Sequence, residues 1–282
     1  MERLKVGGEE IEFSDTGTGE PVLLVHAGVF SDWFVPVAAS IELDGCRVIR
    51  VRRAGYVSGR TSVAHLTLSD HARHCGLLMD AIGIETAHVC GHSSGALVGL
   101  ELALARPASV RTLVLLEPAP CGGLAGPSAE VAGPAFGAAL AAHAAGEGTT
   151  AFDGFMRTVG GERWGAVVES ALGSDGRERA ISESSYFFAD EMPACLEWQF
   201  GPDEAARVLC PVLVVEGEET ANAADLHDDA AVTLAAMVPG AELAVLAGTN
   251  HLLPLQDPNG VAALVAGFAV RHPIGRTSPV PS

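Results

Sequence analysis

Short apolar runs alternate with helical patterns through about the first 120 residues, and this alternation is typical of a parallel sheet built from strand–helix–strand units. Strands are predicted over residues 4–6, 10–14, 22–26, 47–51, 87–90 and 110–116, of which the first two form a hairpin. Helices are predicted over residues 31–40, 69–82 and 94–106, with Ser69 or Asp70 capping the second. Ligands of such sheets bind beyond the carboxyl ends of the strands, so the residues that follow each strand are the candidates for function.

The pattern changes between Pro118 and Arg207. This segment is rich in Ala and Gly, contains several prolines and has helical periodicity without β-branched runs. A compact domain does not accommodate about 90 residues without structure, so we expect short helices that form a lid. Strands at 211–215 and 242–246 and helices at 225–237 and 258–271 then resume the α/β pattern. The predicted organisation is an α/β core of residues 1–117 and 208–272, a helical lid of residues 118–207, and a disordered tail of residues 273–282.

The charge balance excludes several classes of partner. The 282 residues include 17 Lys and Arg against 35 Asp and Glu, a net charge of −18, so nucleic acid and an anionic membrane surface would repel the chain. A spanning helix needs about 20 continuous apolar residues, and the longest apolar run, residues 261–270, is much shorter. No apolar stretch follows the charges at the start of the chain, so no signal peptide is predicted. We expect a cytoplasmic protein that acts on a small-molecule substrate, and assembly as a homodimer stays open.

The cysteines and histidines do not predict a metal site. The six cysteines are dispersed without a CxxC pair, which favours reduced thiols over a disulfide framework or a zinc site. His71 and His74 share a predicted helix face, but Arg73 lies between them and no thiolate or paired carboxylates are near in the sequence. We interpret this pair as part of a solvated helix face, and we expect neither a metal nor an organic cofactor.

A candidate nucleophile lies in residues 87–96, where Gly91-x-Ser93-x-Gly95 stands between a predicted strand and a predicted helix. At so tight a turn the nucleophile takes strained backbone dihedrals, and the residues two before and two after it must be small. Gly91 and Gly95 meet this requirement for Ser93, whereas no such pair flanks Ser94. We therefore predict Ser93 as the nucleophile. The structural alternative is a Gly/Ser-rich turn that only caps a helix.

This motif and the strand–helix pattern resemble the α/β-hydrolase superfamily over nearly the whole chain. The resemblance is to its serine-nucleophile branch with the acid after strand six, which includes esterases and lactonases, and it implies a mostly parallel eight-stranded sheet flanked by helices. Residues 26–28, His-Ala-Gly, are similar to the family's His-Gly turn. By that match the backbone N–H groups of Gly28, or of Val29, and of Ser94 form the oxyanion hole. Residues 51–56 depart from the family pattern, so substrate contacts are not transferred to that loop.

A serine nucleophile needs a base and an acid that orients the base. His251 follows the last predicted strand, where the family has its catalytic histidine. Most relatives have an Asp after strand seven, but Thr220 occupies that position here, and a neutral hydroxyl does not stabilise an imidazolium as a carboxylate does. Glu117 ends the sixth predicted strand, where a minority branch has its acid. We assign Glu117 as the acid, with Glu218, Glu219 or a Ser–His dyad as the alternatives.

The residues and the resemblance together predict a serine hydrolase that cleaves a carboxylic ester or lactone through an acyl-enzyme. A carbon–carbon bond hydrolase acting on a β-diketone-type substrate would use the same triad, and a non-hydrolytic ligand-binding member is a further alternative. The aromatic residues of the lid favour a medium-sized hydrophobic substrate, with Val29 and Trp198 lining its pocket. His26 and His92 are expected to have structural or pocket-lining roles.

Overall fold

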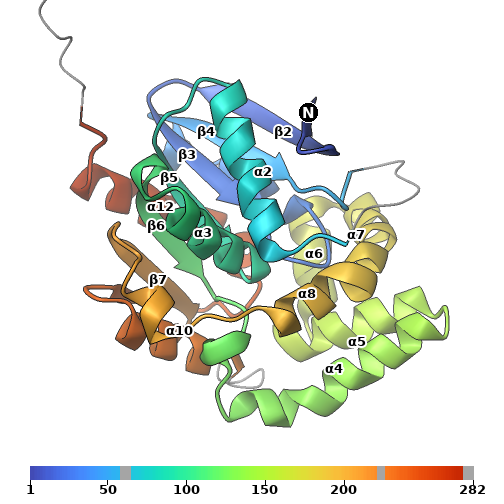
Figure 1. The fold of residues 1–282 in the computed structure, drawn as a ribbon. Helices are drawn as coiled ribbons and strands as arrows, with labels where there is room; N and C mark the ends of the chain where they lie inside the picture. Colours follow the sequence, from blue (N-terminus) through green and yellow to red (C-terminus); the bar gives the residue numbers. More distant parts are fainter. Residues whose placement is uncertain (58–64, 221–225, 276–282) are drawn as a thin grey trace, which may run out of the picture.

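The apolar runs predicted as strands come together in one sheet (Figure 1). The fold is taken from a computed structural model, which describes residues 1–57, 65–220 and 226–275, without the side chains of residues 226–228. The strands are β1 (Glu2–Val6), β2 (Glu9–Gly17), β3 (Glu20–Val25), β4 (Cys46–Arg52), β5 (Ala87–His92), β6 (Val110–Leu116), β7 (Val212–Gly217) and β8 (Glu242–Leu246). Their order is β1-β2-β4-β3-β5-β6-β7-β8, with β1–β2 and β2–β4 antiparallel and the other pairs parallel. The predicted eight-stranded, mostly parallel sheet is confirmed.

Helices cover both faces of the sheet, which explains why its central strands are continuously apolar. Leu23 and Val25 of β3 pack into a core with α2 (Leu68–Ala81), α3 (Ser94–Ala105) and α10 (Leu226–Met237). Val22 and Leu24 face the opposite core, with α1 (Val35–Ala38) and α12 (Pro258–Arg271). Within the described ranges, none of the helices combines the length and the hydropathy needed to cross a bilayer.

Two expectations about α2 are corrected. The helix begins at Leu68, and its cap is Thr67: Thr67 and Asp70 form a capping box, in which each side chain accepts a hydrogen bond from the other residue's backbone N–H. His71 and His74 do not lie on a solvated face, because they are only 1% and 2% exposed. The helix packs on α3 and β1, and Nε2 of His71 lies 3.1 Å from the hydroxyl of Tyr186.

The segment between β6 and β7, residues 118–207, is termed the insertion. Its helices are η4 (Gly122–Leu124), α4 (Ser128–Ala144), α5 (Gly148–Gly160), α6 (Trp164–Leu172), α7 (Ser174–Tyr186), η5 (Phe187–Glu191), α8 (Met192–Glu197) and α9 (Pro202–Ala205), and α4–α8 gather beside the sheet (Figure 1). They enclose an aromatic core that also receives Phe30 and Trp33 from the segment after β3. Its action as a lid stays a prediction. Asp225 of the helix predicted over 225–237, and residues 276–282 of the predicted tail, lie outside the described residues.

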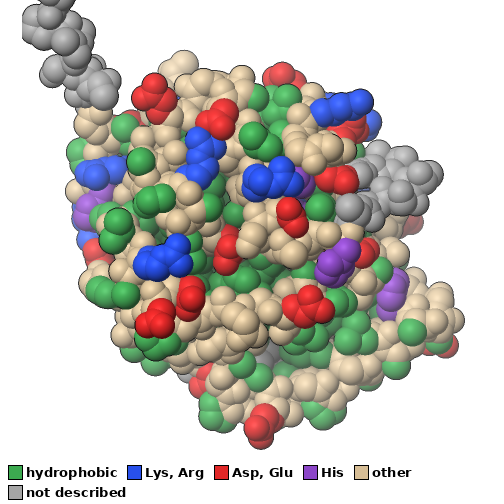
Figure 2. Space-filling view, in the orientation of Figure 1, with side chains coloured by type: hydrophobic (Ala, Val, Ile, Leu, Met, Phe, Trp, Pro, Cys, Tyr) green, Lys and Arg blue, Asp and Glu red, His purple; other side chains and the backbone are tan. Residues whose placement is uncertain are grey.

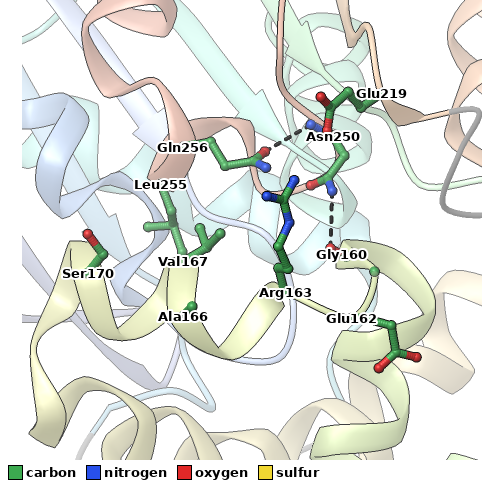
Figure 3. A pocket seen from close by; sticks show the side chains of 11 residues that line it. Gly160, Glu162, Arg163, Ala166, Val167, Ser170, Glu219, Asn250, Leu255 and Gln256 are labelled. Atoms are coloured by element: carbon green, nitrogen blue, oxygen red, sulfur yellow. Dashed lines mark hydrogen bonds between the residues drawn. The ribbon is translucent and has the colours of Figure 1, made fainter.

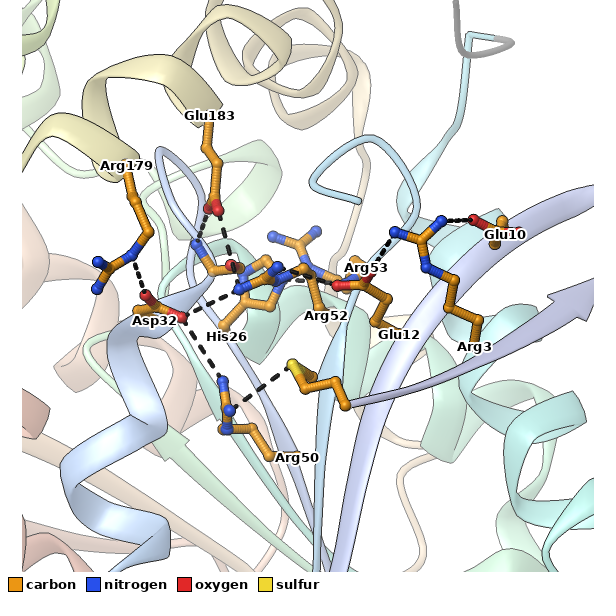
Figure 4. A network of polar contacts seen from close by, with 12 residues as sticks. Arg3, Glu10, Glu12, His26, Asp32, Arg50, Arg52, Arg53, Arg179 and Glu183 are labelled. Carbon is orange, nitrogen blue, oxygen red and sulfur yellow. Dashed lines mark hydrogen bonds and ion pairs between the residues drawn. The ribbon is translucent and has the colours of Figure 1, made fainter. Parts of the chain in front are cut away.

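A polar network joins α7 of the insertion to the segment after β3 (Figure 4). The carboxylate of Glu183 accepts a hydrogen bond from the backbone N–H of Ser31 at 2.7 Å. The carboxylate of Asp32 lies 3.3 Å from Arg52 and 3.4 Å from Arg179. The insertion is therefore attached to the core at a place close to the predicted oxyanion turn.

Candidate active site

Ser93 lies at the turn from β5 to α3 in a strained conformation, with φ 54° and ψ −119°. Both flanking positions must be glycine, because neither has room for a Cβ atom. A Cβ at Gly91 would lie 2.2 Å from the carbonyl oxygen of Gly95, and a Cβ at Gly95 would lie 2.3 Å from that of Val25. The N–H of Ser93 donates to the carbonyl of Leu116 at 2.9 Å, which ties the turn to the end of β6. This is the geometry of a nucleophile elbow.

A cavity of about 320 Å³ adjoins Ser93 and Ser94. Its walls come mainly from α4, α5, η5 and α8, with the side chains of Phe136, Leu140, Phe155, Phe187, Met192 and Leu196 among them. Among the described residues, no Asp, Glu, Lys or Arg lines it. Hydrophobic side chains gather where α8 approaches α4 and α5 on the face shown in Figure 2. The arrangement suits an uncharged, apolar group bound beside Ser93.

His251 lies between β8 and α11 (Leu253–Gln256), and its side chain is 3% exposed. Its ring centroid is 4.8 Å from that of His92, the residue before Ser93, and Nε2–H of His92 donates to the carbonyl of His251 at 3.0 Å. These contacts hold the histidine loop against the elbow. Burial lowers the pKa of His251, so the imidazole is neutral at pH 7 and can act as a base.

Glu117 follows β6 and is fully buried, with a left-handed backbone at φ 44°. Its Oε1 accepts hydrogen bonds from the N–H of Gly217 at 2.6 Å and from the hydroxyl of Thr220 at 2.5 Å. Its Oε2 lies 3.3 Å from Nδ1 of His251. A neutral imidazole that donates from Nδ1 presents Nε2 as the proton acceptor. The Glu117 carboxylate can therefore fix the tautomer that a base requires.

The other two candidate acids have different surroundings. Glu218 is exposed, and its carboxylate accepts a hydrogen bond from the N–H of Gly248 at 3.0 Å. Glu219 lines a second cavity, of about 510 Å³, together with Arg163 and Asn250 (Figure 3). There the amide of Asn250 donates to the carbonyl of Gly160 at 3.1 Å, so the loop that carries His251 is also tied to the insertion.

His26 fixes the turn after β3. Its Nε2 accepts a hydrogen bond from the N–H of Arg53 at 3.1 Å, so its proton is on Nδ1, which donates to the carbonyl of Ala27 at 2.6 Å. Burial, together with the positive charge of Arg53, lowers the pKa of His26 and keeps the ring neutral. The predicted structural role of His26 is consistent with these contacts.

Gly28 lies on this turn between an aromatic ring and the elbow. A Cβ at Gly28 would lie 2.5 Å from the ring of Phe187 and 3.4 Å from Oγ of Ser94. The indole of Trp33 donates to the carbonyl of Gly28 at 2.9 Å, and Val29 has a left-handed φ of 73°. The structure therefore brings together Gly28 and Ser94, the two residues predicted to form the oxyanion hole.

Two residues predicted to line the substrate pocket are absent from the described walls of the cavity at Ser93. Trp198 stacks on Phe200, with the ring centroids 5.3 Å apart, and its indole donates to Glu101 at 2.8 Å. It therefore belongs to the core beside α3 and not to the cavity. Val29 is 2% exposed and packs in the aromatic core shared with the insertion.

Sequence reasoning missed a buried polar cluster next to Ser94. Arg53 and Glu191 form an ion pair at 2.7 Å, with side chains 1% and 0% exposed. The hydroxyl of Tyr56 donates to Oε2 of Glu191, and that of Ser94 donates to Oε1 at 2.5 Å. Residues 51–56 depart from the family pattern, but no feature of the sequence connects Arg53 and Tyr56 with Glu191.

A family model described as the Alpha/beta hydrolase family matches residues 22–264. The chain therefore belongs to this family, as the sequence predicted. It is 31% identical over 116 residues to a putative carbamate hydrolase, RutD, of Azorhizobium caulinodans, which is 39% of this chain and 42% of that protein. The chain thus spans less than half the length of the first curated relatives that it matches.

Two further similarities extend over most of the chain. Carboxylesterase YbfK of Bacillus subtilis is 24% identical over 278 residues, which is 88% of this chain and 79% of that protein. Among solved structures, the enol-lactonase from Burkholderia xenovorans LB400 has a TM-score of 0.79 at 19% identity, covering 95% of this chain and 100% of that one. At such identity the structural likeness establishes the fold.

Proposed function

We propose that the protein is a serine hydrolase that cleaves a carboxylic ester or a lactone through an acyl-enzyme, with Ser93, His251 and Glu117 as the triad. One observation carries the proposal: Nδ1 of His251 lies 3.3 Å from the buried carboxylate of Glu117, and the histidine loop packs on the residue before the strained Ser93. A structural role alone does not require a strained serine, a buried histidine and a buried glutamate at one edge of a sheet.

In the proposed reaction Oγ of Ser93 attacks the substrate carbonyl while Nε2 of His251 takes its proton. The negative charge on the tetrahedral oxygen is stabilised by the backbone N–H groups of Gly28 and Ser94. His251 then protonates the leaving alkoxide, which leaves an acyl group on Ser93. Water, deprotonated by His251, releases the acid and restores the serine. Whenever His251 holds the transferred proton, the carboxylate of Glu117 stabilises the imidazolium.

The cavity supports an uncharged, hydrophobic acyl group of medium size. Its volume of about 320 Å³ is at the lower end of the usual range for ligand pockets, and no charged side chain is present among its described walls. A substrate carboxylate bound there would be desolvated without a cationic partner. Relatives named as a carboxylesterase and an enol-lactonase agree with acyl transfer to water.

The experiment is a turnover panel with purified protein. The substrates are p-nitrophenyl acetate, butyrate and octanoate, an aliphatic lactone and a β-diketone, and the variants are Ser93→Ala and, as the control, Ser174→Ala in an exposed position of α7. We expect ester or lactone hydrolysis that Ser93→Ala abolishes and Ser174→Ala preserves. Turnover of the β-diketone alone would support the carbon–carbon hydrolase instead. No turnover of any substrate would contradict the proposal.

A further inference from the structure

Residues Phe187–Glu191 form a π-helical segment between α7 and α8. Such segments are rare, and they occur frequently at functional sites. Both ends of this one contact the active-site region of the core. The ring of Phe187 packs against Gly28, where a Cβ would lie 2.5 Å from it, and Oε1 of Glu191 accepts the hydroxyl hydrogen of Ser94 at 2.5 Å. One segment of the insertion thus touches both residues whose N–H groups would form the oxyanion hole.

Arg53, which belongs to the core, is connected to Ser94 directly and to the turn at Gly28 through His26. Its guanidinium binds Glu191 at 2.7 Å and approaches Oγ of Ser94 at 3.4 Å. Its backbone N–H donates to Nε2 of His26 (Figure 4). Nδ1 of His26 in turn donates to the carbonyl of Ala27, the residue before Gly28. Burial opposes the charge of Arg53, but the carboxylate of Glu191 raises its pKa above the ordinary value, so the guanidinium stays charged.

We propose that Glu191 is a positioning residue for the oxyanion hole: it holds the side chain of Ser94, and through it the orientation of the Ser94 N–H, relative to Gly28. The inference rests on the proposed serine-hydrolase function. An N–H group stabilises a developing oxyanion only when it is aimed at the position of that oxygen before the reaction. The cavity beside it is apolar, so misalignment is not compensated by water.

Attachment of the insertion is a weaker explanation of the same contacts. Other carboxylates already join the insertion to the core: Glu183 binds Ser31, and Glu101 binds Trp198. A fully buried ion pair also contributes little net stability compared with well-packed apolar side chains. Attachment also leaves the hydrogen bond from Ser94 to Glu191 unexplained, because a carboxylate that only attaches the insertion does not need this contact.

The test compares four variants. Ser94→Ala removes the hydroxyl that donates to Glu191 and keeps the backbone N–H. Glu191→Gln removes the charge of the acceptor. Because that change leaves the buried guanidinium without its carboxylate, Arg53→Met/Glu191→Leu removes both charges and keeps an apolar core. Glu101→Gln is the matched control, because Glu101 lies on the same helix as Ser94 and binds the insertion through Trp198.

Four quantities are measured for each folded variant: kcat and KM for p-nitrophenyl butyrate, the inhibition constant of an octyl trifluoromethyl ketone, and the inhibition constant of 1-octanol. The ketone forms a tetrahedral adduct with an oxyanion, whereas the alcohol only fills the cavity. Loosening of one donor predicts a loss of about 10- to 100-fold in kcat, which is less than the loss on removing a donor. The affinity for the ketone should fall by about the same factor as kcat/KM, while KM and the affinity for octanol change less than about threefold. Glu101→Gln should stay within about twofold in every quantity.

Different outcomes overturn different statements. The role of Glu191 is overturned if the wild-type protein is active and both Ser94→Ala and Arg53→Met/Glu191→Leu keep kcat within about twofold of it. Equal losses of ketone and octanol affinity overturn it as well, because the contacts then shape the cavity and not the oxyanion hole. A wild-type protein that hydrolyses no ester and no lactone overturns the proposed function itself.

Discussion

The hydroxyl of Thr220 lies 2.5 Å from Oε1 of Glu117, and its hydrogen bond is directed to that carboxylate. The resemblance to the family places its usual acid at the position of Thr220, after strand seven. In this chain the Thr220 hydroxyl instead binds a carboxylate that follows β6. With the N–H of Gly217 as a second donor, Oε1 is fixed and Oε2 is directed to His251. The missing Asp is therefore consistent with a complete triad.

Glu117→Gln should lower kcat by up to about 10⁴-fold, because the amide keeps the shape but neither selects the imidazole tautomer nor stabilises the imidazolium. Glu218→Gln and Glu219→Gln should each change kcat by less than about tenfold, since these carboxylates lie near the surface. The measurement is steady-state hydrolysis of p-nitrophenyl butyrate after circular dichroism has shown that all three variants are folded. Near-normal turnover of Glu117→Gln together with a large loss in either of the others would place the acid after β7.

Thr220→Val should lower both the free energy of unfolding and kcat. The hydroxyl is buried and donates to the buried carboxyl group of Glu117, and leaving such a buried polar group without its partner typically destabilises a protein by about 2 kcal/mol. Greater freedom of the Glu117 carboxylate should reduce kcat by about tenfold. Urea unfolding and ester turnover measure the two effects. The control is Thr158→Val on α5, whose hydroxyl donates to the carbonyl of Gly154; equal effects in both variants would show that the contact with Glu117 is unimportant.

The pH profile should reflect the burial of His251, which lowers its pKa. Since the neutral imidazole is the base, kcat/KM should remain high at pH 6.5 and decline only at lower pH. The free energy of unfolding should also fall as the pH is lowered, because of the same shift in the pKa of His251. Between the lowered pKa of the folded state and the value of about 6.5 in the unfolded chain, the unfolded state binds more protons, so the contribution is complete above pH 6.5 and is lost as pH falls. An acidic limb of kcat/KM centred at or above pH 6.5 would contradict this account.

Leu140→Trp should shorten the preferred acyl chain. Leu140 of α4 lines the cavity at Ser93, and a larger ring there reduces the room for the substrate. We expect the ratio of kcat/KM for p-nitrophenyl octanoate to that for acetate to fall about tenfold, with acetate hydrolysis nearly unchanged. Leu209→Trp, in an exposed position outside this cavity, is the control. An unchanged ratio would mean that the acyl group binds elsewhere.

The sheet and the elbow could be predicted because both depend on local features. Apolar runs at strand length define the order of elements, and the need for small residues at Gly91 and Gly95 is a steric property of the turn itself. The prediction of Glu117 as the acid used two things together: its position directly after an apolar strand, and the resemblance to a branch of the family that has its acid there. That this carboxylate lies 3.3 Å from Nδ1 of His251 could be learned only from the folded structure, because the two residues are 134 positions apart in the chain.

The remaining features depend on how the insertion packs on the core. Arg53 and Glu191 are 138 residues apart in the chain, and no periodicity relates them. The same packing buries His71 against Tyr186, although the helical pattern of α2 alone suggested a solvated face. An aromatic residue such as Trp198 has equal hydrophobicity in a core and in a cavity wall, so its place in the core could not be predicted from its type.

Covalent labelling of the serine tests the central claim most directly. The protein is treated with a fluorophosphonate, digested, and the modified peptide is identified by tandem mass spectrometry. Serine-hydrolase chemistry at the elbow predicts one adduct, on Ser93, formed much more slowly in His251→Ala and retained in Ser94→Ala. An adduct on Ser94 with Ser93 unmodified, or an actively hydrolysing protein in which Ser93 is never labelled, would contradict the assignment of Ser93 as the nucleophile.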